Sequence, residues 1–270
     1  MTVSRRDLLK GSLPFMVGAA LGGISGVAPR LVSGAEADKQ MAVPQPPWPY
    51  KKLDSIAVAE SAYDGYYTGA CNYGVFESII GALRKEVGFP YTAFPSAMMV
   101  VGEGGVAQVA SLCGSLNGAA HAIFLITGGL DKKQREVPFA LIQDLYNWYE
   151  QAPLPDYKPK NAKYQIVTSV SKSNLCHVSV SKWCKVAKVK SFSKERSERC
   201  AWLTAAVAKQ TVDLLNKQAD GAFKPTYAMS ADVKACRSCH DQKGTIENTR
   251  AMMDCGGCHF TGKAPKHPKI

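Results

Sequence analysis

The stretch AVAESAYDGYYTGACNYGVFESIIGALRKEVG, residues 57–88, decides the fold of this chain. Its apolar residues recur with the spacing of an amphipathic helix, and this period begins near Ser55. A second helical pattern, SERCAWLTAAVAKQTVDLLNKQADG, covers 197–221 and ends at Gly221, a residue type that commonly follows the last turn of a helix. With 46% hydrophobic residues the chain can bury one substantial core. The sequence therefore predicts a mainly α fold.

Between these two helices the pattern breaks and resumes. GEGG at 102–105 ends the first helical region, and a small-residue helical segment follows at 106–129. Another amphipathic stretch covers 135–150 and is closed by a proline-rich run. Residues 163–183 alternate β-branched and polar side chains, a pattern compatible with a strand. The expected architecture is helical up to about residue 225.

The C-terminal segment holds two copies of Cys-x-x-Cys-His. The first copy is Cys236, Cys239 and His240, and the second is Cys255, Cys258 and His259. Each copy is typical of covalent c-type haem attachment, in which two thiols bind the porphyrin and the adjoining histidine binds one face of the iron. The sequence predicts two haems c per chain in a small, irregular segment, 226–270, after a helical, cysteine-containing domain, 38–225.

A zinc ribbon is the alternative for these cysteines. Fifteen residues separate Cys239 from Cys255, and a CxxC-x15-CxxC spacing also fits structural zinc. A zinc ribbon does not require a histidine after both pairs, yet both pairs have one in a chain with only five histidines. The pattern favours haem.

The N-terminus is typical of an export signal. SRRDLLK at 4–10 precedes a modest apolar, glycine-containing run, and Ala35 and Ala37 form an Ala-x-Ala exit. The run is too short and not apolar enough to form a membrane span, which needs roughly 20 strongly apolar residues. Residues 1–37 are therefore predicted to be a twin-arginine signal peptide, which leaves a periplasmic protein without a membrane anchor.

The export route bears on the remaining cysteines. Twin-arginine export carries folded chains, whereas haem c is attached outside the cytoplasm, so a second centre assembled before export is expected. Five cysteines lie outside the haem motifs, and they are Cys71, Cys113, Cys176, Cys184 and Cys200. Two disulfides and one free thiol are the alternative in the periplasm. A thiolate-bound metal cluster accounts better for the export route.

Three segments carry a resemblance to a known family. GACNYGVFESIIGAL at 69–83, GEGGVAQVASLCGSLNGAAHAI at 102–123 and WCKVAKVKSFSKERSERCAW at 183–202 resemble a four-cysteine redox-protein family with a Cys-Gly-Ala-x-x-Gly motif. The matching cysteines are Cys71, Cys113, Cys184 and Cys200, which leaves Cys176 as the spare. Ser115 stands where the motif has alanine. With two haem motifs behind it, the chain is similar to the split-Soret cytochromes c.

That resemblance implies several properties. It implies a periplasmic homodimer with two bis-histidine haems per subunit packed close together at one end, and a [2Fe–2S] iron–sulfur centre held by three cysteines in the other domain. The sequence is consistent with close haems, because only 14 residues separate His240 from Cys255. A short polar segment cannot enclose two macrocycles, so their apolar faces must pack against each other, the helical domain or a second subunit.

Three histidines remain as candidates for the sixth haem ligands. His121 lies in LNGAAHAIF, where small residues allow a flat ring to approach; the alternative is a buried core histidine. His177 lies in the alternating stretch, where the alternative is an exposed strand histidine. His267 lies in the lysine-rich terminus and is the weakest candidate. We predict His121 and His177 as ligands, one or both from the partner subunit.

The charge of the chain limits the class of partner. The formal net charge is +11, and removing residues 1–37, with four basic and two acidic side chains, leaves +9. The densest basic stretch is 182–196, which is either a solvated lysine face or a docking surface for an acidic redox protein. Nucleic acid is not expected in the periplasm.

Two function classes follow from these features. Bis-histidine haems have no open coordination position, so the pattern favours an electron-transfer protein that exchanges electrons with periplasmic redox proteins. The alternative is a reductase whose substrate reacts at the iron–sulfur centre or at an open haem. No catalytic triad or phosphate-binding loop is recognisable in the sequence, which favours the carrier.

Overall fold

The computed structural model describes residues 42–250 and 252–255. The predicted signal peptide, together with Cys258, His259 and His267, lies outside the described residues. Contacts divide the chain into two units, Met1–Ala42 and Val43–Ile270, and the described helices all belong to the second.

The described residues form six α-helices and three short 3-10 helices. In chain order they are α1 (Ser55–Glu86), η2 (Tyr91–Ala93), η3 (Ser96–Gly102), α2 (Gly114–Thr127), η4 (Lys133–Arg135), α3 (Glu136–Gln151), α4 (Cys176–Ala187), α5 (Lys194–Ala219) and α6 (Ala231–His240). The prediction of a mainly α fold is confirmed. Within the described ranges, no helix is long and apolar enough to span a bilayer.

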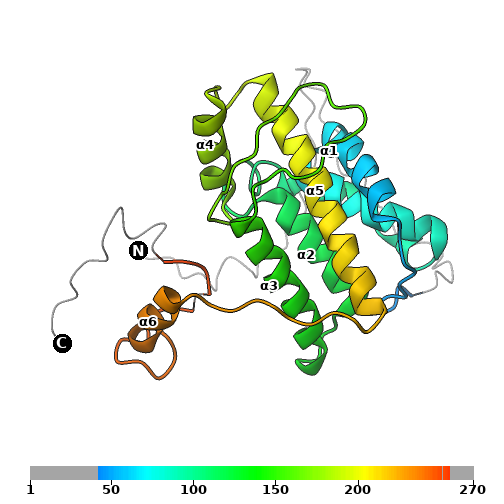
Figure 1. Ribbon diagram of the computed structural model, residues 1–270. Helices are drawn as coiled ribbons and strands as arrows, with labels where there is room; N and C mark the ends of the chain where they lie inside the picture. Colours follow the sequence, from blue (N-terminus) through cyan, green and yellow to red (C-terminus); the bar gives the residue numbers. More distant parts are fainter. Residues whose placement is uncertain (1–41, 251, 256–270) are drawn as a thin grey trace, which may run out of the picture. The chain divides into compact units, whose positions relative to one another are not determined.

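The core lies where α1, α2, α3 and α5 meet. α1 packs along α5, and α2 contacts α1, α3 and α5 (Figure 1). Each helix contributes the apolar stripe that its periodicity predicts, including Phe76 and Ile80 from α1, Ile123 from α2 and Val207 from α5. Caps fix where the helices begin: Asp54 accepts bonds from the first backbone N–H groups of α1, and Ser193 caps α5 in the same way.

Helix α1 is interrupted in the middle, which its periodicity does not show. Gly69 (φ −147°, ψ 25°) and Ala70 (φ 63°, ψ −170°) have non-helical backbone angles. For alanine, this conformation costs on the order of 1–3 kcal/mol, and such strain is typical of functional sites. The kink directly precedes Cys71.

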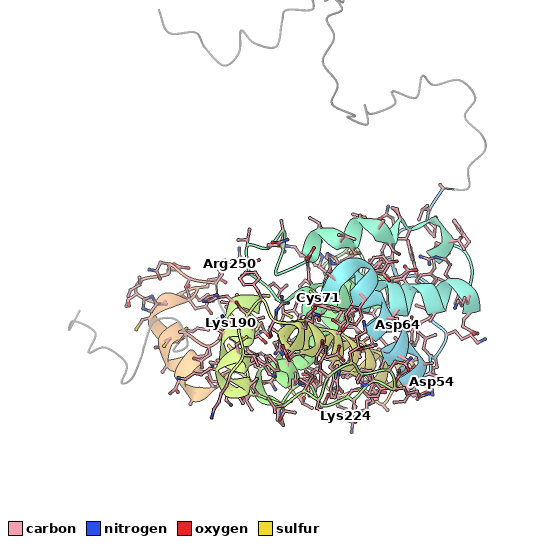
Figure 2. The ribbon with its side chains drawn as sticks, turned by 90° about the horizontal axis from the view of Figure 1, so that it is seen from above. Asp54, Asp64, Cys71, Lys190, Lys224 and Arg250 are labelled. Carbon is pink, nitrogen blue, oxygen red and sulfur yellow. The ribbon has the colours of Figure 1, made fainter. Side chains whose placement is uncertain are left out.

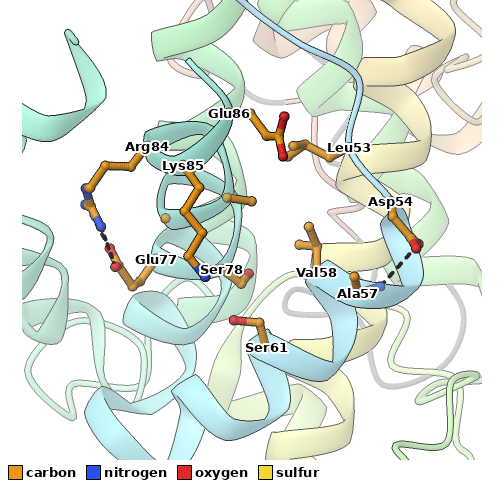
Figure 3. Close-up of a pocket in the computed structure, with 12 residues that line it drawn as sticks. Leu53, Asp54, Ala57, Val58, Ser61, Glu77, Ser78, Arg84, Lys85 and Glu86 are labelled. Atoms are coloured by element: carbon orange, nitrogen blue, oxygen red, sulfur yellow. Dashed lines mark hydrogen bonds and ion pairs between the residues drawn. The ribbon is translucent and has the colours of Figure 1, made fainter. Parts of the chain in front are cut away.

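The two halves of α1 enclose an open hollow of about 420 Å³ (Figure 3). Its lining comes from 53–61 and 77–86, and it includes the Glu77–Arg84 ion pair at 2.7 Å. This lining contains no cysteine or histidine, so the hollow offers no ligand for haem or for an iron–sulfur centre.

The stretch 163–183 does not form a strand. Only Ser169 and Leu175 make isolated β-bridges there, with Leu154 and Leu112, and α4 begins at Cys176. The alternation is misleading because the buried side chains of α4 are Ser179 and Trp183, which are four residues apart as on a helix face. His177 is therefore an exposed helix residue rather than a strand residue.

A buried carboxylate joins α5 to α1 and to the loop before α4. Glu198 is fully buried. It accepts bonds from the Tyr63 hydroxyl (2.9 Å), the Trp202 indole (2.8 Å), the Lys163 backbone N–H (2.8 Å) and the Tyr67 hydroxyl. Burial alone would raise the pKa of Glu198, but the bonds from Tyr67, Trp202 and Lys163 outweigh it and hold this pKa below its usual value.

We expect the substitution Glu198→Gln to destabilise the protein by about 2 kcal/mol at neutral pH, because an amide cannot accept all four bonds. The lowered pKa means that the carboxylate stabilises the fold above the unfolded-state pKa of about 4.3, and that this contribution is lost as the pH falls through the folded-state value. Urea unfolding followed by circular dichroism at several pH values measures the difference. Glu195→Gln on the same helix is the control, and an equal effect of both variants would contradict this assignment.

Candidate functional site

Three cysteines from three helices line one cavity. Cys71 follows the kink of α1, Cys176 begins α4 and Cys200 lies in α5, around a volume of about 570 Å³. Tyr66 and Arg196 also line it. Figure 2 marks Cys71 among the helices. The fold therefore gathers thiols that are up to 129 residues apart in the sequence.

Cys113 completes this set of thiols. Burial and the neighbouring Cys113, Cys200 and Cys176 raise the pKa of the Cys71 thiol well above its usual value, although a backbone bond from Gly104 opposes the shift. Burial, Cys113 and Cys200 raise the pKa of Cys176 to about 12. Cys113 directly precedes Gly114, which packs against the Cys71 Sγ, so it lies next to the three cysteines that line the cavity. We call Cys71, Cys113, Cys176 and Cys200 the four-cysteine cluster.

Cys184 stands apart from the four-cysteine cluster. Its thiol interacts electrostatically with Cys200 and with two arginines, Arg196 and Arg199, and burial raises its pKa. It does not line the cavity that Cys71, Cys176 and Cys200 share. The sequence analysis left Cys176 outside the set of matched cysteines. The structure instead groups Cys176 with Cys71 and Cys200 and leaves Cys184 outside the cavity lining.

Glycines allow the cysteine-bearing segments to approach closely. A Cβ on Gly114 would lie 2.4 Å from the Cys71 Sγ, and a Cβ on Gly105 would lie 2.8 Å from the Cys176 Cβ. Gly105 also has a positive φ of 73°. These contacts give a physical reason for two glycines of the quoted motifs, GEGG and CGSLNG.

The loop after GEGG has an unusual left-handed backbone. Val106, Ala107, Gln108 and Ala110 all have positive φ angles, between 49° and 65°. Each such non-glycine residue costs roughly 1–2 kcal/mol, and valine rarely adopts this region. Gln108 and Ala110 line the cavity, and the Ala110 carbonyl accepts from the backbone N–H of His177. The strain is therefore concentrated at the four-cysteine cluster.

A buried guanidinium lies beside the four-cysteine cluster. Arg199 is 2% exposed; its Nη2 donates to Ser179 Oγ at 2.8 Å and its Nη1 lies 3.9 Å from Cys200 Sγ. Its Nε has no hydrogen-bond partner, and none of the ion pairs within the described ranges involves it. Burial lowers the pKa of Arg199, but the neighbouring Cys200, Tyr149 and Cys113 outweigh burial, so the net shift is upward. A buried cation needs a counter-charge, and the neighbouring cysteines would supply one as thiolates when they bind a metal.

This arrangement suits a metal cluster better than a single ion. Among the described side chains, no three His, Cys, Asp or Glu residues converge closely enough to hold one metal ion. A single zinc ion would need thiolates about 2.3 Å from one point. Thiols distributed around a cavity, beside a cation without a carboxylate, fit the larger and anionic iron–sulfur unit.

The first haem motif forms one face of α6. Cys236, Cys239 and His240 occupy positions i, i+3 and i+4, so their side chains share a face of the helix. Ser230 caps this helix by accepting from the Val233 N–H at 3.2 Å. Helical geometry thus explains why two thiols and a ligand histidine at this spacing can serve one macrocycle.

Asn248 orients the histidine of this motif. The Nδ1 of His240 lies 2.8 Å from Asn248 Oδ1, and an amide oxygen can only accept, so Nδ1 carries the proton. Nε2 is then the nitrogen with the lone pair that binds a metal. The loop that carries Asn248 is fixed to the end of α6 by backbone bonds from Ile246 to Cys239 and from Thr249 to His240, both 2.9 Å.

The second haem motif is described only at its first cysteine. Burial and contact with Cys236 raise the pKa of the Cys255 thiol, so the first thiols of the two motifs are neighbours. Cys258 and His259 lie outside the described residues. None of the eight described cysteines forms a disulfide.

A buried aspartate fixes the start of the C-terminal segment. Asp144 of α3 accepts from the backbone N–H of Thr226 (2.9 and 3.0 Å), from its hydroxyl (3.0 Å) and from the N–H of Tyr227 (2.6 Å). The Tyr227 hydroxyl in turn donates to the Met252 carbonyl at 2.8 Å. The segment is therefore anchored at 226, where the sequence predicts the domain boundary.

The two candidate ligand histidines lie on different helices. His121 is exposed on α2. His177 is exposed on α4 and lines the cavity of the four-cysteine cluster. The alternative in which His121 is a fully buried core histidine does not hold, because its side chain is exposed, although partial burial lowers its pKa.

Four roles escaped the sequence interpretation, those of Arg199, Asn248, Asp144 and Cys176. Arg199 adjoins Cys200 in the sequence, but only the fold shows that it is buried without a carboxylate. Asn248 and Asp144 belong to no motif. For Cys176 a signal existed, because GEGG and CGSLNG mark close backbone contacts, and one of these contacts is made to Cys176.

Comparison with known proteins assigns the family. Residues 73–214 match the family described as "Putative redox-active protein (C_GCAxxG_C_C)", a range that contains Cys113, Cys176, Cys184 and Cys200 and begins just after Cys71. The chain therefore belongs to this redox-protein family and, by the relatives described next, to the split-Soret cytochromes c. The resemblance to this family is confirmed, but its motif is corrected, because the description gives Gly-Cys-Ala-x-x-Gly rather than Cys-Gly-Ala-x-x-Gly.

One relative and one solved structure, both described as the split-Soret cytochrome c of the same bacterial strain, carry the second part of that assignment. The chain is 37% identical over 271 residues to the split-Soret cytochrome c of Desulfovibrio desulfuricans (strain ATCC 27774 / DSM 6949 / MB), covering 96% of this chain and 95% of the relative. A solved structure described as "A novel iron centre in the split-Soret cytochrome c from Desulfovibrio desulfuricans ATCC 27774" superposes with a TM-score of 0.73 at 38% identity. That match covers 80% of this chain and 91% of the other.

Proposed function

We propose that this chain is a periplasmic c-type cytochrome that transfers electrons through two bis-histidine haems and one iron–sulfur centre. The observation that carries the proposal is the division of the thiols into two sets. One set, which includes Cys236 and Cys255, belongs to the C-terminal segment and its haem motifs. The other is the four-cysteine cluster of the helical domain. Two chemically different redox centres in one chain make an electron relay.

Six residues would hold the two haems. Cys236 and Cys239 attach the first and His240 binds its iron, while Cys255, Cys258 and His259 do the same for the second. Contact between the Cys236 and Cys255 thiols supports haems that lie close together. Bound haem supplies an iron that stores one electron, and histidine ligation on both faces leaves no open position for substrate.

The four-cysteine cluster would supply the three cysteine ligands expected of the [2Fe–2S] iron–sulfur centre. Cys71, Cys176 and Cys200 line the cavity, Cys113 is coupled to Cys71 and Cys176, and the buried Arg199 balances the negative charge. This choice replaces Cys184 by Cys176 in the set first expected. The relative's structure is described as containing a novel iron centre, which supports an iron site in this chain as well.

We propose that the functional unit is a homodimer in which His121 and His177 complete the haems, one or both of them across the interface. Exposed apolar side chains support a second subunit: Met98, Val100, Val101, Val106 and Val109 are all at least 38% exposed. Backbone bonds join these two segments, because Ala107 N–H donates to the Val101 carbonyl at 2.8 Å. An apolar surface of this kind commonly marks an interaction site.

The cellular location and partners follow from the same proposal. The twin-arginine pattern at 4–10 would export the folded helical domain with its iron–sulfur centre, and haem attachment would follow in the periplasm. Other periplasmic redox proteins would act as electron donor and acceptor. The basic mature chain favours acidic partners.

A reductase is the second candidate function. The observation in its favour is the cavity itself, which is open and lined by Arg196 and His177 as well as by thiols. A guanidinium and an imidazole can bind a small anion next to a redox centre. In that case the chain would reduce such an anion rather than only pass electrons on.

Analysis of the purified holoprotein tests the proposal. We expect two covalently bound haems per chain by mass spectrometry, iron in excess of the haem iron, and acid-labile sulfide. If the chain is only an electron carrier, we expect low-spin haem spectra that carbon monoxide and nitrite leave unchanged. If it is a reductase, we expect a high-spin haem fraction and anion-dependent turnover. Stoichiometric zinc without haem would overturn both.

A further inference from the structure

The surface beside the four-cysteine cluster has an unusual composition. α4, the turn after it and the first residue of α5 present Lys185, Val186, Lys188, Lys190, Phe192 and Lys194, here called the Lys–Phe patch. Phe192 is 96% exposed and Val186 56% exposed. The four lysines are exposed, and none takes part in the ion pairs formed within residues 42–250 and 252–255.

The local fold does not explain why Phe192 is apolar. Phe192 directly precedes Ser193, the cap of α5. An apolar residue at this position usually packs against an apolar residue four positions after the cap, which here is Ser197. Without such a partner, the phenyl ring contributes nothing to the start of the helix.

The backbone holds the Lys–Phe patch in a defined turn. Lys188 ends α4 in the left-handed conformation (φ 57°, ψ 39°), and the Val189 N–H donates to the Cys184 carbonyl at 3.2 Å. Ser193 N–H donates to the Lys190 carbonyl at 3.1 Å, and its side chain caps α5. The exposed ring is therefore carried by a structured turn between two helices.

The Lys–Phe patch adjoins the cavity of the cysteines. Phe192 lines that cavity together with Cys71, Cys176 and Cys200. A protein that covered the ring would therefore lie at the edge of the four-cysteine cluster. Among the large exposed apolar side chains that the structure describes, this adjacency distinguishes Phe192.

We propose that the Lys–Phe patch is the docking surface for an acidic electron-transfer protein, which exchanges electrons with the centre held by the four-cysteine cluster. The inference rests on the proposed function. An exposed aromatic ring is a common anchor at the centre of an interface, and unpaired cations around it steer the encounter with an acidic protein. Pairing the patch with itself in a second copy would bring lysines against lysines.

The test measures reduction of the holoprotein by a reduced acidic flavodoxin, used as the probe, in a stopped-flow spectrometer. For the wild type we expect a second-order rate constant that falls as the salt concentration rises. The double variant Lys185→Glu and Lys190→Glu should be at least tenfold slower at low salt, with a flatter salt dependence. Phe192→Ser should be several-fold slower with an unchanged salt dependence.

The chain offers a matched control. Leu130 is 71% exposed and precedes the exposed Lys132 and Lys133, so it combines the same residue types elsewhere in the chain. Leu130→Ser and the double variant Lys132→Glu and Lys133→Glu should keep the wild-type rate. All variants should react equally with photoreduced 5-deazariboflavin, a small uncharged donor, which shows that the redox centres are intact.

Three results would overturn the inference. Patch variants that react with flavodoxin as fast as the wild type would show that docking occurs elsewhere. Loss of the dimer in Phe192→Ser, seen by analytical ultracentrifugation, would assign the patch to contact with a second copy. If the wild type binds anionic phospholipid vesicles and the patch variants do not, the patch would be assigned to a membrane surface. Absence of iron and sulfide beyond the haems would instead overturn the iron–sulfur part of the proposed function, while the difference between patch and control variants would still report whether an acidic protein docks on the Lys–Phe patch.

Discussion

Replacing Cys176 by alanine is expected to remove the iron–sulfur centre, whereas replacing Cys184 by alanine is expected to leave it in place. The reason is geometric. Cys176 lines the cavity with Cys71 and Cys200, and its thiol interacts with those of Cys113 and Cys200. Cys184 interacts with Cys200 among the thiols and does not line the cavity.

Iron and acid-labile sulfide per chain measure this difference directly. In Cys176→Ala the iron beyond the haem iron should fall at least tenfold, while Cys184→Ala should keep the wild-type content. The haem content should be unchanged in both variants, since the haem motifs lie in the C-terminal segment. This makes haem an internal control for expression and export.

The opposite pattern would restore the assignment first made from the sequence. If Cys184→Ala lost the iron–sulfur centre and Cys176→Ala kept it, the family-matched set with Cys184 would be right, and the grouping around the cavity would not describe the loaded protein. Cys71→Ala and Cys200→Ala should lose the centre under either assignment, so they establish that the assay detects a ligand.

The sequence predicts the long helices of this fold well but not their local breaks. The apolar period of α1 and α5 is sustained over many residues, and buried stripes follow it in the structure. The kink at Gly69 and Ala70 leaves that period intact on both sides, so periodicity cannot reveal it. In α4 the two buried residues, Ser179 and Trp183, are too few to establish a helical period against the alternation around them.

The two candidate sites also differ in how well the sequence alone predicts them. Local spacing identifies the first haem motif, because Cys236, Cys239 and His240 act within one helix. The four-cysteine cluster is instead assembled from α1, α2, α4 and α5, and sequence spacing does not state which thiols meet. The strained loop around Val106 and the buried Arg199 are consequences of that assembly, so they too are visible only in the fold.

Replacing Arg199 by methionine is expected to lower the reduction potential of the iron–sulfur centre by about 100 mV. A unit charge roughly 6 Å away, at an effective dielectric constant of about 20, changes a one-electron potential by this amount. Arg199 is buried, lies beside Cys200 and Cys113, and pairs with no carboxylate among the described residues, so its charge is weakly screened. Its N–H groups also stabilise anionic sulfur, which raises the potential of such centres.

Redox titration followed by electron paramagnetic resonance measures the centre separately from the haems. Arg199→Lys keeps the charge but loses the planar donor geometry, so its potential should fall by less than that of Arg199→Met. The haem potentials should stay at the wild-type values, because Arg199 belongs to α5 of the helical domain and not to the haem segment. A methionine variant with an unchanged potential for the iron–sulfur centre would show that the positive charge is neutralised by something other than sulfur. Equal shifts in the haems and in the iron–sulfur centre would show a general change in the protein rather than a local interaction between Arg199 and the four-cysteine cluster.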